Sequence, residues 1–316
     1  EVLPGHATVS LVSKAADQYV PKNAINVKVG TVKITAGEND TTVSSVEITR
    51  FGLATIDTSE VKLVLRNNSV ESRDAFVNKT TNKASVKFSP ALELKARSSM
   101  TFDLVVSIKW NLDDLNANNI HGFRVTDVVV ANGTSTGTPV ELGTIKTTSA
   151  ESKTVTVDVK NGETSLKAGE NNKVIAKVNF DFNQAGWVIN GFSLLQTNVS
   201  ADKTRINEIF ENAKVFVDEK EVGTAVISKD KIIVSDLNIA KDRTEDVDVE
   251  IRANAIFVGE TTSMNLKLEN LFAKEWDSGY GMTYGEANIV ETPTPISVKG
   301  YDIKLKKVNI EKDVLE

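Results

Sequence analysis

The sequence predicts an all-β protein made of two tandem immunoglobulin-like antiparallel β-sandwich domains, followed by an extra C-terminal strand. Three observations lead to this prediction. Apolar and polar residues alternate along almost every apolar segment, the second half of the chain repeats the pattern of the first half, and a strand-like segment follows the repeat. The length of 316 residues also corresponds to about two ordinary domains.

The alternation has a period of two residues. Segments such as VKVGTVKIT (27–35) and TFDLVVSIKW (101–110) are rich in β-branched and aromatic residues, and Gly, Asn and Asp clusters separate them. One apolar and one polar face are typical of antiparallel sheets that cover a core. DKTRINEIFENA (202–213) differs, because its apolar residues have helical spacing. We therefore expect a short helical insertion there, outside the core, because the first repeat lacks it.

The repeat is clearest where residues 85–108 align without gaps on residues 230–253. The aligned pairs keep the inward parity of each strand; three of them are Phe102 with Val247, Leu104 with Val249 and Val106 with Ile251. The alignment predicts a first domain over 1–150 and a duplicate over 151–295. The connector TTSAES (147–152) is short and polar, so we expect the two domains to form a semi-rigid rod.

The C-terminal segment 296–316 begins where the first strand of a third repeat would begin. A single strand is not stable in water, so it must add to an edge of its own domain or to an edge of a neighbouring molecule. We predict that one terminal strand is donated to a neighbour; the first candidate is 296–310 and the second is 7–13. The apolar positions assigned to this intersubunit strand are Ile296, Val298, Tyr301, Ile303, Leu305, Val308 and Ile310.

The layout of the first domain resembles a known class of proteins. TRFGLATIDTSEVKLVLRN (49–67) is followed by a short hairpin and then by SPALELKARSSMTFDLVVSI (89–108). This layout is similar to the tandem β-sandwich repeats of secreted microbial surface proteins, including S-layer, pilus and filament subunits. The second domain fits less well, because FSLLQTNV (192–199) replaces the Phe-Gly element. The resemblance implies extracellular display and self-assembly, and it assigns no site residues.

Composition favours a non-catalytic protein. The net charge of −6 gives no electrostatic reason to expect a nucleic-acid partner. The apolar runs are too short for a membrane-spanning helix, and the lack of cysteine excludes disulfides and thiol chemistry. The two histidines, His6 and His121, lack the spacing of a metal-binding pair, and we expect both on the surface or in loops.

Two clusters are candidate ligand sites. Trp276, Tyr280 and Tyr284 fall in one predicted loop, where aromatic rings can stack on sugars; alternatively they cover the end of a sandwich or line a subunit contact. Asp246, Asp248 and Glu250 alternate on the outward face of one predicted strand. A bound Ca²⁺ or a basic partner would relieve their repulsion, and the plainer interpretation is a solvated strand face.

The acidic loop NLDDLN (111–116) is a weaker calcium candidate. Glycan attachment is a further candidate, because Asn-x-Ser/Thr sequons occur at Asn39, Asn67, Asn78, Asn132 and Asn198.

The sequence as a whole favours a structural subunit of an extracellular filament or surface layer, a homopolymer that assembles through β-strand addition between subunits. The alternative is a monomeric surface adhesin or carbohydrate-binding module. The C-terminal segment distinguishes the two functions. In a monomeric binder it should pair within its own sheet, and the loop that holds Trp276 and Tyr284 should stay exposed.

Overall fold

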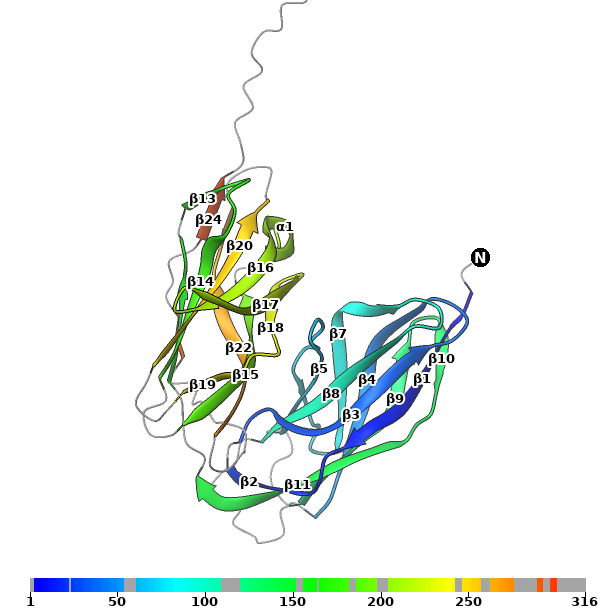
Figure 1. Cartoon of the computed structure of the whole chain (residues 1–316). Helices are drawn as coiled ribbons and strands as arrows, with labels where there is room; N and C mark the ends of the chain where they lie inside the picture. The colour runs from blue at the N-terminus through cyan, green and yellow to red at the C-terminus, as the bar shows by residue number, and fades with distance from the viewer. Residues whose placement is uncertain are drawn as a thin grey trace, which may run out of the picture.

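A computed structural model confirms the all-β class (Figure 1). The described residues are 3–22, 24–53, 61–108, 120–151, 156–163, 165–181, 186–197, 204–241, 246–256, 262–275, 289–291 and 296–299. Within them the strands group into two units, which are called here the first unit (3–151) and the second unit (156–299). Each unit has its own apolar core.

The first unit is a sandwich of two sheets. One sheet has the order β10-β1-β3-β8-β5-β6, with β1 (Gly5–Lys14), β3 (Val27–Ala36), β5 (Val61–Arg66), β6 (Ala75–Phe76), β8 (Ser99–Ile108) and β10 (Gly133–Thr136). The other has the order β2-β11-β9-β4-β7, with β2 (Gln18–Lys22), β4 (Thr41–Phe51), β7 (Lys83–Leu94), β9 (Ile120–Val130) and β11 (Val140–Glu151).

The alternation in the sequence places the core of the first unit between these sheets. On β8 the side chains of Phe102, Leu104 and Val106 are fully buried, as expected for the inward face. Phe88 on β7 packs against Phe102 from the opposite sheet, with ring centroids 5.2 Å apart. Each large side chain buried in this way contributes roughly 1.5–3 kcal/mol.

The second unit has a longer path of strands, β19-β15-β18-β17-β16-β20-β14-β12-β23, with β22 paired to β15, and a small sheet β13-β24-β21. The bounds are β12 (Thr156–Asn161), β13 (Ser165–Lys167), β14 (Lys173–Asp181), β15 (Trp187–Gln196), β16 (Phe210–Val217), β17 (Lys220–Ser228), β18 (Lys231–Val234), β19 (Ile239–Lys241), β20 (Val247–Ala255), β21 (Thr262–Met264), β22 (Leu266–Glu275), β23 (Ile289–Glu291) and β24 (Ile296–Lys299).

Strand pairing in the second unit follows that of the first. The order β1-β3-β8-β5-β6 has its counterpart in β12-β14-β20-β16-β17, and β9-β4-β7 has its counterpart in β22-β15-β18. Even the parallel partner at one edge recurs, since β1 pairs with β10 and β12 pairs with β23. The residues that align in sequence on β8 and β20 therefore occupy equivalent strands.

The helical insertion differs from its expected extent and role. Helix α1 spans only Ile206–Ile209, and β16 begins directly after it at Phe210. Ile206, Ile209 and Phe210 are all buried in the core of the second unit. The expectation that the insertion lies outside the core was therefore wrong, because its apolar stripe has no other place to be shielded from water.

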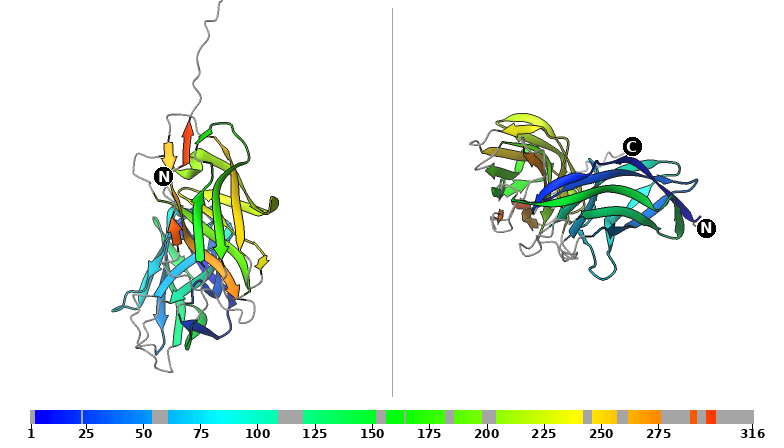
Figure 2. Two further views of the ribbon diagram at one scale, coloured as in Figure 1. Left: turned by 90° about the vertical axis from the view of Figure 1, so that its left-hand side faces the viewer. Right: turned by 90° about the horizontal axis from the view of Figure 1, so that it is seen from below.

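The connector and the rod-like arrangement also differ from expectation. Strand β11 continues through most of the connector to Glu151, which pairs with Lys22 of β2. The units do not simply follow one another end to end. They lie at an angle, and strands β15, β18 and β22 of the second unit meet the β5–β8 side of the first (Figures 1 and 2).

Candidate functional site

The described part of the predicted intersubunit strand pairs within its own chain. Strand β24 lies between β13 and β21, with Val298 opposite Leu166 in a parallel pair and opposite Thr262 in an antiparallel pair. Ile296 and Val298 therefore belong to a strand with both edges occupied. The other assigned positions, Tyr301, Ile303, Leu305, Val308 and Ile310, lie outside the described residues.

On the acidic strand face, Glu250 is paired with two cations and Asp248 with an amide. The Glu250 carboxylate lies 2.7 Å from Lys177 and 2.6 Å from Arg252. Burial raises the pKa of Glu250, but these two hydrogen-bonded cations outweigh it and leave the pKa below its usual value. Asp248 accepts a hydrogen bond from Asn179 at 2.8 Å. Residual burial and the nearby Asp181 carboxylate raise the pKa of the exposed Asp246.

No cluster of three Asp, Glu or His side chains within the described ranges is arranged to hold a metal ion. The acidic loop 111–116 and the aromatic residues Trp276, Tyr280 and Tyr284 lie outside those ranges.

One of the two histidines is buried, which contradicts the surface expectation. His121 lies on β9 with no exposed area, and Arg50 donates a hydrogen bond from Nε to its Nδ1 at 3.0 Å. His6 is partly buried on β1, where its ring contacts the hydroxyls of Thr134 and Thr136 on the neighbouring edge strand β10. Neither histidine has a second imidazole or a carboxylate cluster beside it among the residues described.

The sequons differ in how far their amides are used inside the fold. Asn67 Oδ1 accepts from the backbone N–H groups of Ser69 and Val70, and its amide nitrogen donates to the Thr101 carbonyl. The Asn39 amide donates to the Pro4 carbonyl. Asn78 Oδ1 holds a tight turn, Asn132 is exposed in the turn between β9 and β10, and Asn198 lies outside the described residues.

The most distinctive site is the contact between the two units, and its centre is apolar. Val64 on β5 and Val105 on β8 are direct cross-strand neighbours, and Phe272 on β22 packs against them. The Arg66 guanidinium lies over the Phe272 ring, 3.3 Å from its centroid. Cation–π contacts of this kind are stronger when they are shielded from water.

A short segment before β3 extends this contact. Ile25 packs against the core of the second unit, although it belongs to the first. The amide of Asn26 donates to the Leu271 carbonyl of β22 at 2.7 Å, while its backbone N–H donates to Ser107 on β8 at 2.8 Å. Asn26 therefore ties an edge of the second unit to a central strand of the first.

A polar network surrounds the apolar centre, and Glu71 is its hub. The loop after β5 presents Glu71, because Ser72 bonds back to both backbone groups of Leu65. The buried Glu71 Oε1 accepts hydrogen bonds from Ser193 at 3.0 Å and from the Asn270 amide at 2.8 Å. The Asn270 oxygen in turn accepts from Lys62 at 2.9 Å, so one amide links two charged groups of the first unit.

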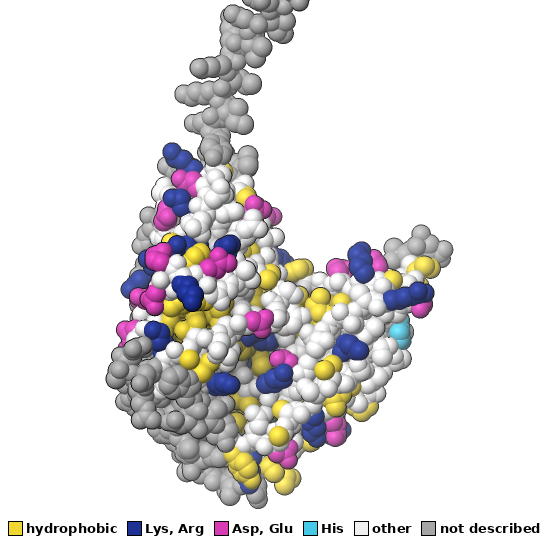
Figure 3. All heavy atoms as spheres, in the orientation of Figure 1, with side chains coloured by type: hydrophobic (Ala, Val, Ile, Leu, Met, Phe, Trp, Pro, Cys, Tyr) yellow, Lys and Arg dark blue, Asp and Glu magenta, His cyan; other side chains and the backbone are white. Residues whose placement is uncertain are grey.

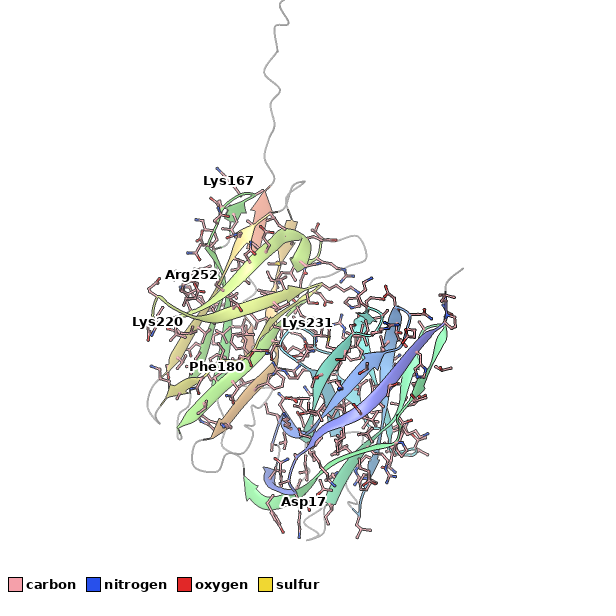
Figure 4. The ribbon with its side chains drawn as sticks, turned by 45° about the vertical axis from the view of Figure 1, so that its right-hand side comes forward. Asp17, Lys167, Phe180, Lys220, Lys231 and Arg252 are labelled. Atoms are coloured by element: carbon pink, nitrogen blue, oxygen red, sulfur yellow. The ribbon has the colours of Figure 1, made fainter. Side chains whose placement is uncertain are left out.

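Lys231 completes the network from β18, where Figure 4 labels it on the side that faces the first unit. Its ammonium group lies 2.5 Å from Glu269 and 3.4 Å from Glu71. The exposed fractions of these three side chains are 5%, 11% and 0%. A second pair joins Arg73 of the first unit to Asp230 of the second at 2.7 Å. Figure 3 shows basic and acidic side chains side by side where the units meet.

Burial perturbs this site electrostatically. Burial raises the pKa of Glu269, the Lys231 ammonium lowers it, and the negative charges of Glu71 and Asp74 raise it further, with a net upward shift. Breaking one partner of a buried ion pair typically costs about 3–5 kcal/mol, because a charge is then left unpaired away from water. Removing one charged side chain from this contact should therefore destabilise the contact strongly.

This interface is not among the sites predicted from the sequence, although the sequence carries a signal of it. In Leu63-Val64-Leu65 and Leu104-Val105-Val106 the alternation breaks into consecutive apolar residues. Such runs indicate strands that are covered on both faces. The polar members gave no comparable signal, because Glu71 and Lys231 are ordinary charged residues that become neighbours only in the folded chain.

Comparisons with known proteins assign this chain to no family. No family model and no curated protein sequence matches the chain. Among solved structures, the C-terminal domain of the Streptococcus agalactiae AgI/II polypeptide BspA has 10% identity, coverage of 94% of this chain and 100% of that one, and a TM-score of 0.22. The C-terminal domain of the Streptococcus pyogenes antigen I/II-family protein AspA has 10% identity, coverage of 95% and 100%, and a TM-score of 0.22.

The calcium binding domain CBD12 of CALX1.1 has 8% identity, coverage of 82% and 79%, and a TM-score of 0.21. Likenesses at these scores transfer no function to this chain. Among the described residues, no helix is long and apolar enough to cross a membrane.

Proposed function

We propose that the protein is a non-catalytic structural subunit of an extracellular filament or surface layer, in which the two sandwiches act as one rigid body and neighbouring subunits are linked by β-strand addition. The observation that carries this proposal is the buried contact between the units. A repeating assembly needs a fixed angle between its parts, and a contact made of Phe272, Glu71 and Lys231 restrains that angle.

The tail supplies the proposed link between neighbours. β24 anchors the chain at the tip of the second unit (Figure 1), and residues with alternating apolar side chains follow it in the sequence, including Tyr301, Ile303 and Leu305. Adding such a strand to a sheet edge of another copy satisfies backbone donors and acceptors and buries several apolar side chains. The extracellular location belongs to the same proposal and rests on the sequence resemblance.

Electron microscopy of the purified chain tests the proposal. Filaments or sheets are expected for the unmodified protein, and folded single particles are expected for the double variant Ile303→Asp, Leu305→Asp. A matched double variant at the adjacent polar positions, Lys304→Ser with Lys306→Ser, should still assemble. Single particles from the unmodified chain at all concentrations would exclude self-assembly.

A monomeric surface adhesin is the second candidate, and the pairing of β24 within its own chain favours it. In that case the unmodified chain should remain monomeric. It should also bind glycans in an array, and the substitutions Trp276→Ala and Tyr280→Ala should abolish that binding, because aromatic stacking would supply most of the contact with the sugar.

A further inference from the structure

We propose that the two units become joined by a covalent amide between their side chains, which links Nζ of Lys62 in the first unit to Cγ of Asn270 in the second. The bond forms within the folded chain and releases ammonia. The proposal concerns the chain itself and does not depend on assembly into filaments.

The two reacting groups already lie together in the contact between the units. Lys62 on β5 places its Nζ atom 2.9 Å from the Oδ1 atom of Asn270 on β22. Because a carbonyl bond is about 1.2 Å long, Nζ lies within about 4 Å of the carbon atom Cγ that it attacks. A reactive approach needs about 3–3.5 Å, so a small movement of the lysine side chain is enough.

The reacting groups are shielded from water. Asn270 is fully buried, and the Lys62 side chain keeps 17% of its surface exposed. The Glu71 side chain beside them has no exposed surface. Water therefore competes poorly with the amine for Cγ, and the fixed geometry gives the amine a high effective concentration. A hydrogen bond between lysine and asparagine on an open surface has neither advantage.

Two carboxylates are placed to move the protons. Asp74 lies 3.4 Å from Lys62 Nζ and can accept a proton from the ammonium group, which leaves a nucleophilic amine. Glu71 Oε1 accepts a hydrogen bond from the Asn270 amide nitrogen at 2.8 Å, so this carboxylate touches the leaving group. Ser193 donates to the same oxygen at 3.0 Å and helps to hold the carboxylate in place.

The step balances without an oxidant, a reductant or a cofactor. Lys62 Nζ forms a bond to Cγ of Asn270, the bond from Cγ to Nδ2 breaks, and Glu71 relays a proton from the attacking nitrogen to the leaving nitrogen. The ammonia then takes up the proton held by Asp74 and leaves as an ammonium ion. The link joins the units at one point, so the surrounding contact can still open when it is weakened.

Mass spectrometry of the intact, denatured chain tests the proposal. The purified protein is first kept folded at neutral pH until its mass no longer changes. Its mass is then expected to be lower than the mass calculated from the sequence by one molecule of ammonia, in essentially all chains. Protease digestion should yield one branched peptide that joins the segment around Lys62 to the segment around Asn270.

Variants locate the bond. Lys62→Arg keeps the positive charge but removes the nucleophile, so its mass should equal its sequence mass. Asn270→Asp should lose water in place of ammonia, because a carboxyl group then replaces the amide. Glu71→Gln removes the proton relay and should slow the reaction by about a hundredfold or more. Lys28→Arg, at an exposed lysine in the same sheet, should lose ammonia like the parent chain.

Circular dichroism verifies that each variant is folded. An unmodified chain that stays at its full sequence mass would overturn the proposal. A loss of ammonia that persists in Lys62→Arg would also overturn it, because an asparagine that cyclises on its own backbone gives the same change in mass.

Discussion

Acidification from pH 7 to pH 5 is expected to lower the free energy of unfolding through one buried side chain, His121. Arg50 donates to His121 Nδ1, so the neutral ring must carry its proton on Nε2, which is buried without a hydrogen-bond partner. Burial and, second to it, the positive charge of Arg50 together lower the pKa of His121 to about 3. The folded protein therefore keeps this imidazole neutral throughout the range from pH 7 to pH 5.

The magnitude follows from proton linkage. In the unfolded chain the imidazole has its ordinary pKa of 6.5, so at pH 5 protonation stabilises the unfolded state by about 2 kcal/mol, and at pH 7 by only about 0.2 kcal/mol. The contribution to stability is fully present above pH 6.5 and is lost as the pH falls toward the folded pKa. The expected loss between pH 7 and pH 5 is therefore about 2 kcal/mol.

Urea unfolding of the unmodified chain and of His121→Asn at both pH values measures this loss. The asparagine side chain does not titrate, and its oxygen can accept the bond from Arg50. The difference in unfolding free energy between the two proteins should shift by about 2 kcal/mol between the two pH values. His6→Asn, which removes the only other histidine, should retain the dependence caused by His121. An equal loss of stability in His121→Asn and in the unmodified chain would refute the reasoning.

Three further predictions concern single side chains. Lys231→Met removes the cation between Glu71 and Glu269 and should weaken the contact between the units by about 3 kcal/mol at pH 7, seen as a fall in energy transfer between dyes on the exposed positions Lys79→Cys and Lys220→Cys while both units stay folded. Gly52→Ala should cost more than about 1 kcal/mol in thermal unfolding, because φ is +118° and a Cβ would lie 2.1 Å from the Ile120 carbonyl oxygen. Ile206→Ala should cost about 2–5 kcal/mol in urea unfolding, since Ile206 is fully buried in the second core; a cost below about 1 kcal/mol would place α1 outside that core.

The sequence predicted the fold class because alternation is a local property. Phe102, Leu104 and Val106 point inward simply because strand residues alternate between faces. The position of Ile206 in the core was not predictable in this way, since a four-residue helix carries too little periodic signal to show what it packs against. The burial of His121 depended on Arg50, which is distant in the sequence and adjacent only across the paired strands β4 and β9.

The candidate site was less predictable than the fold, because it is formed by two separate surfaces. The consecutive apolar residues around Val64 and Val105 indicate a second covered face, but they do not identify what covers it. Phe272, Glu71 and Lys231 come together only when both sandwiches are complete. Long-range pairs of this kind leave no pattern in a single sequence.

The central position of β24 in its small sheet bears on how the chain resists force. A pull on the residues that follow Lys299, directed along the strand, loads the hydrogen bonds to β13 and to β21 at the same time. These bonds then bear the load in shear, and several must break together before the strand slides. Peeling the same strand away sideways would break them one after another. Tension along the strand is therefore resisted more strongly than tension across it, so this end of the protein is mechanically directional.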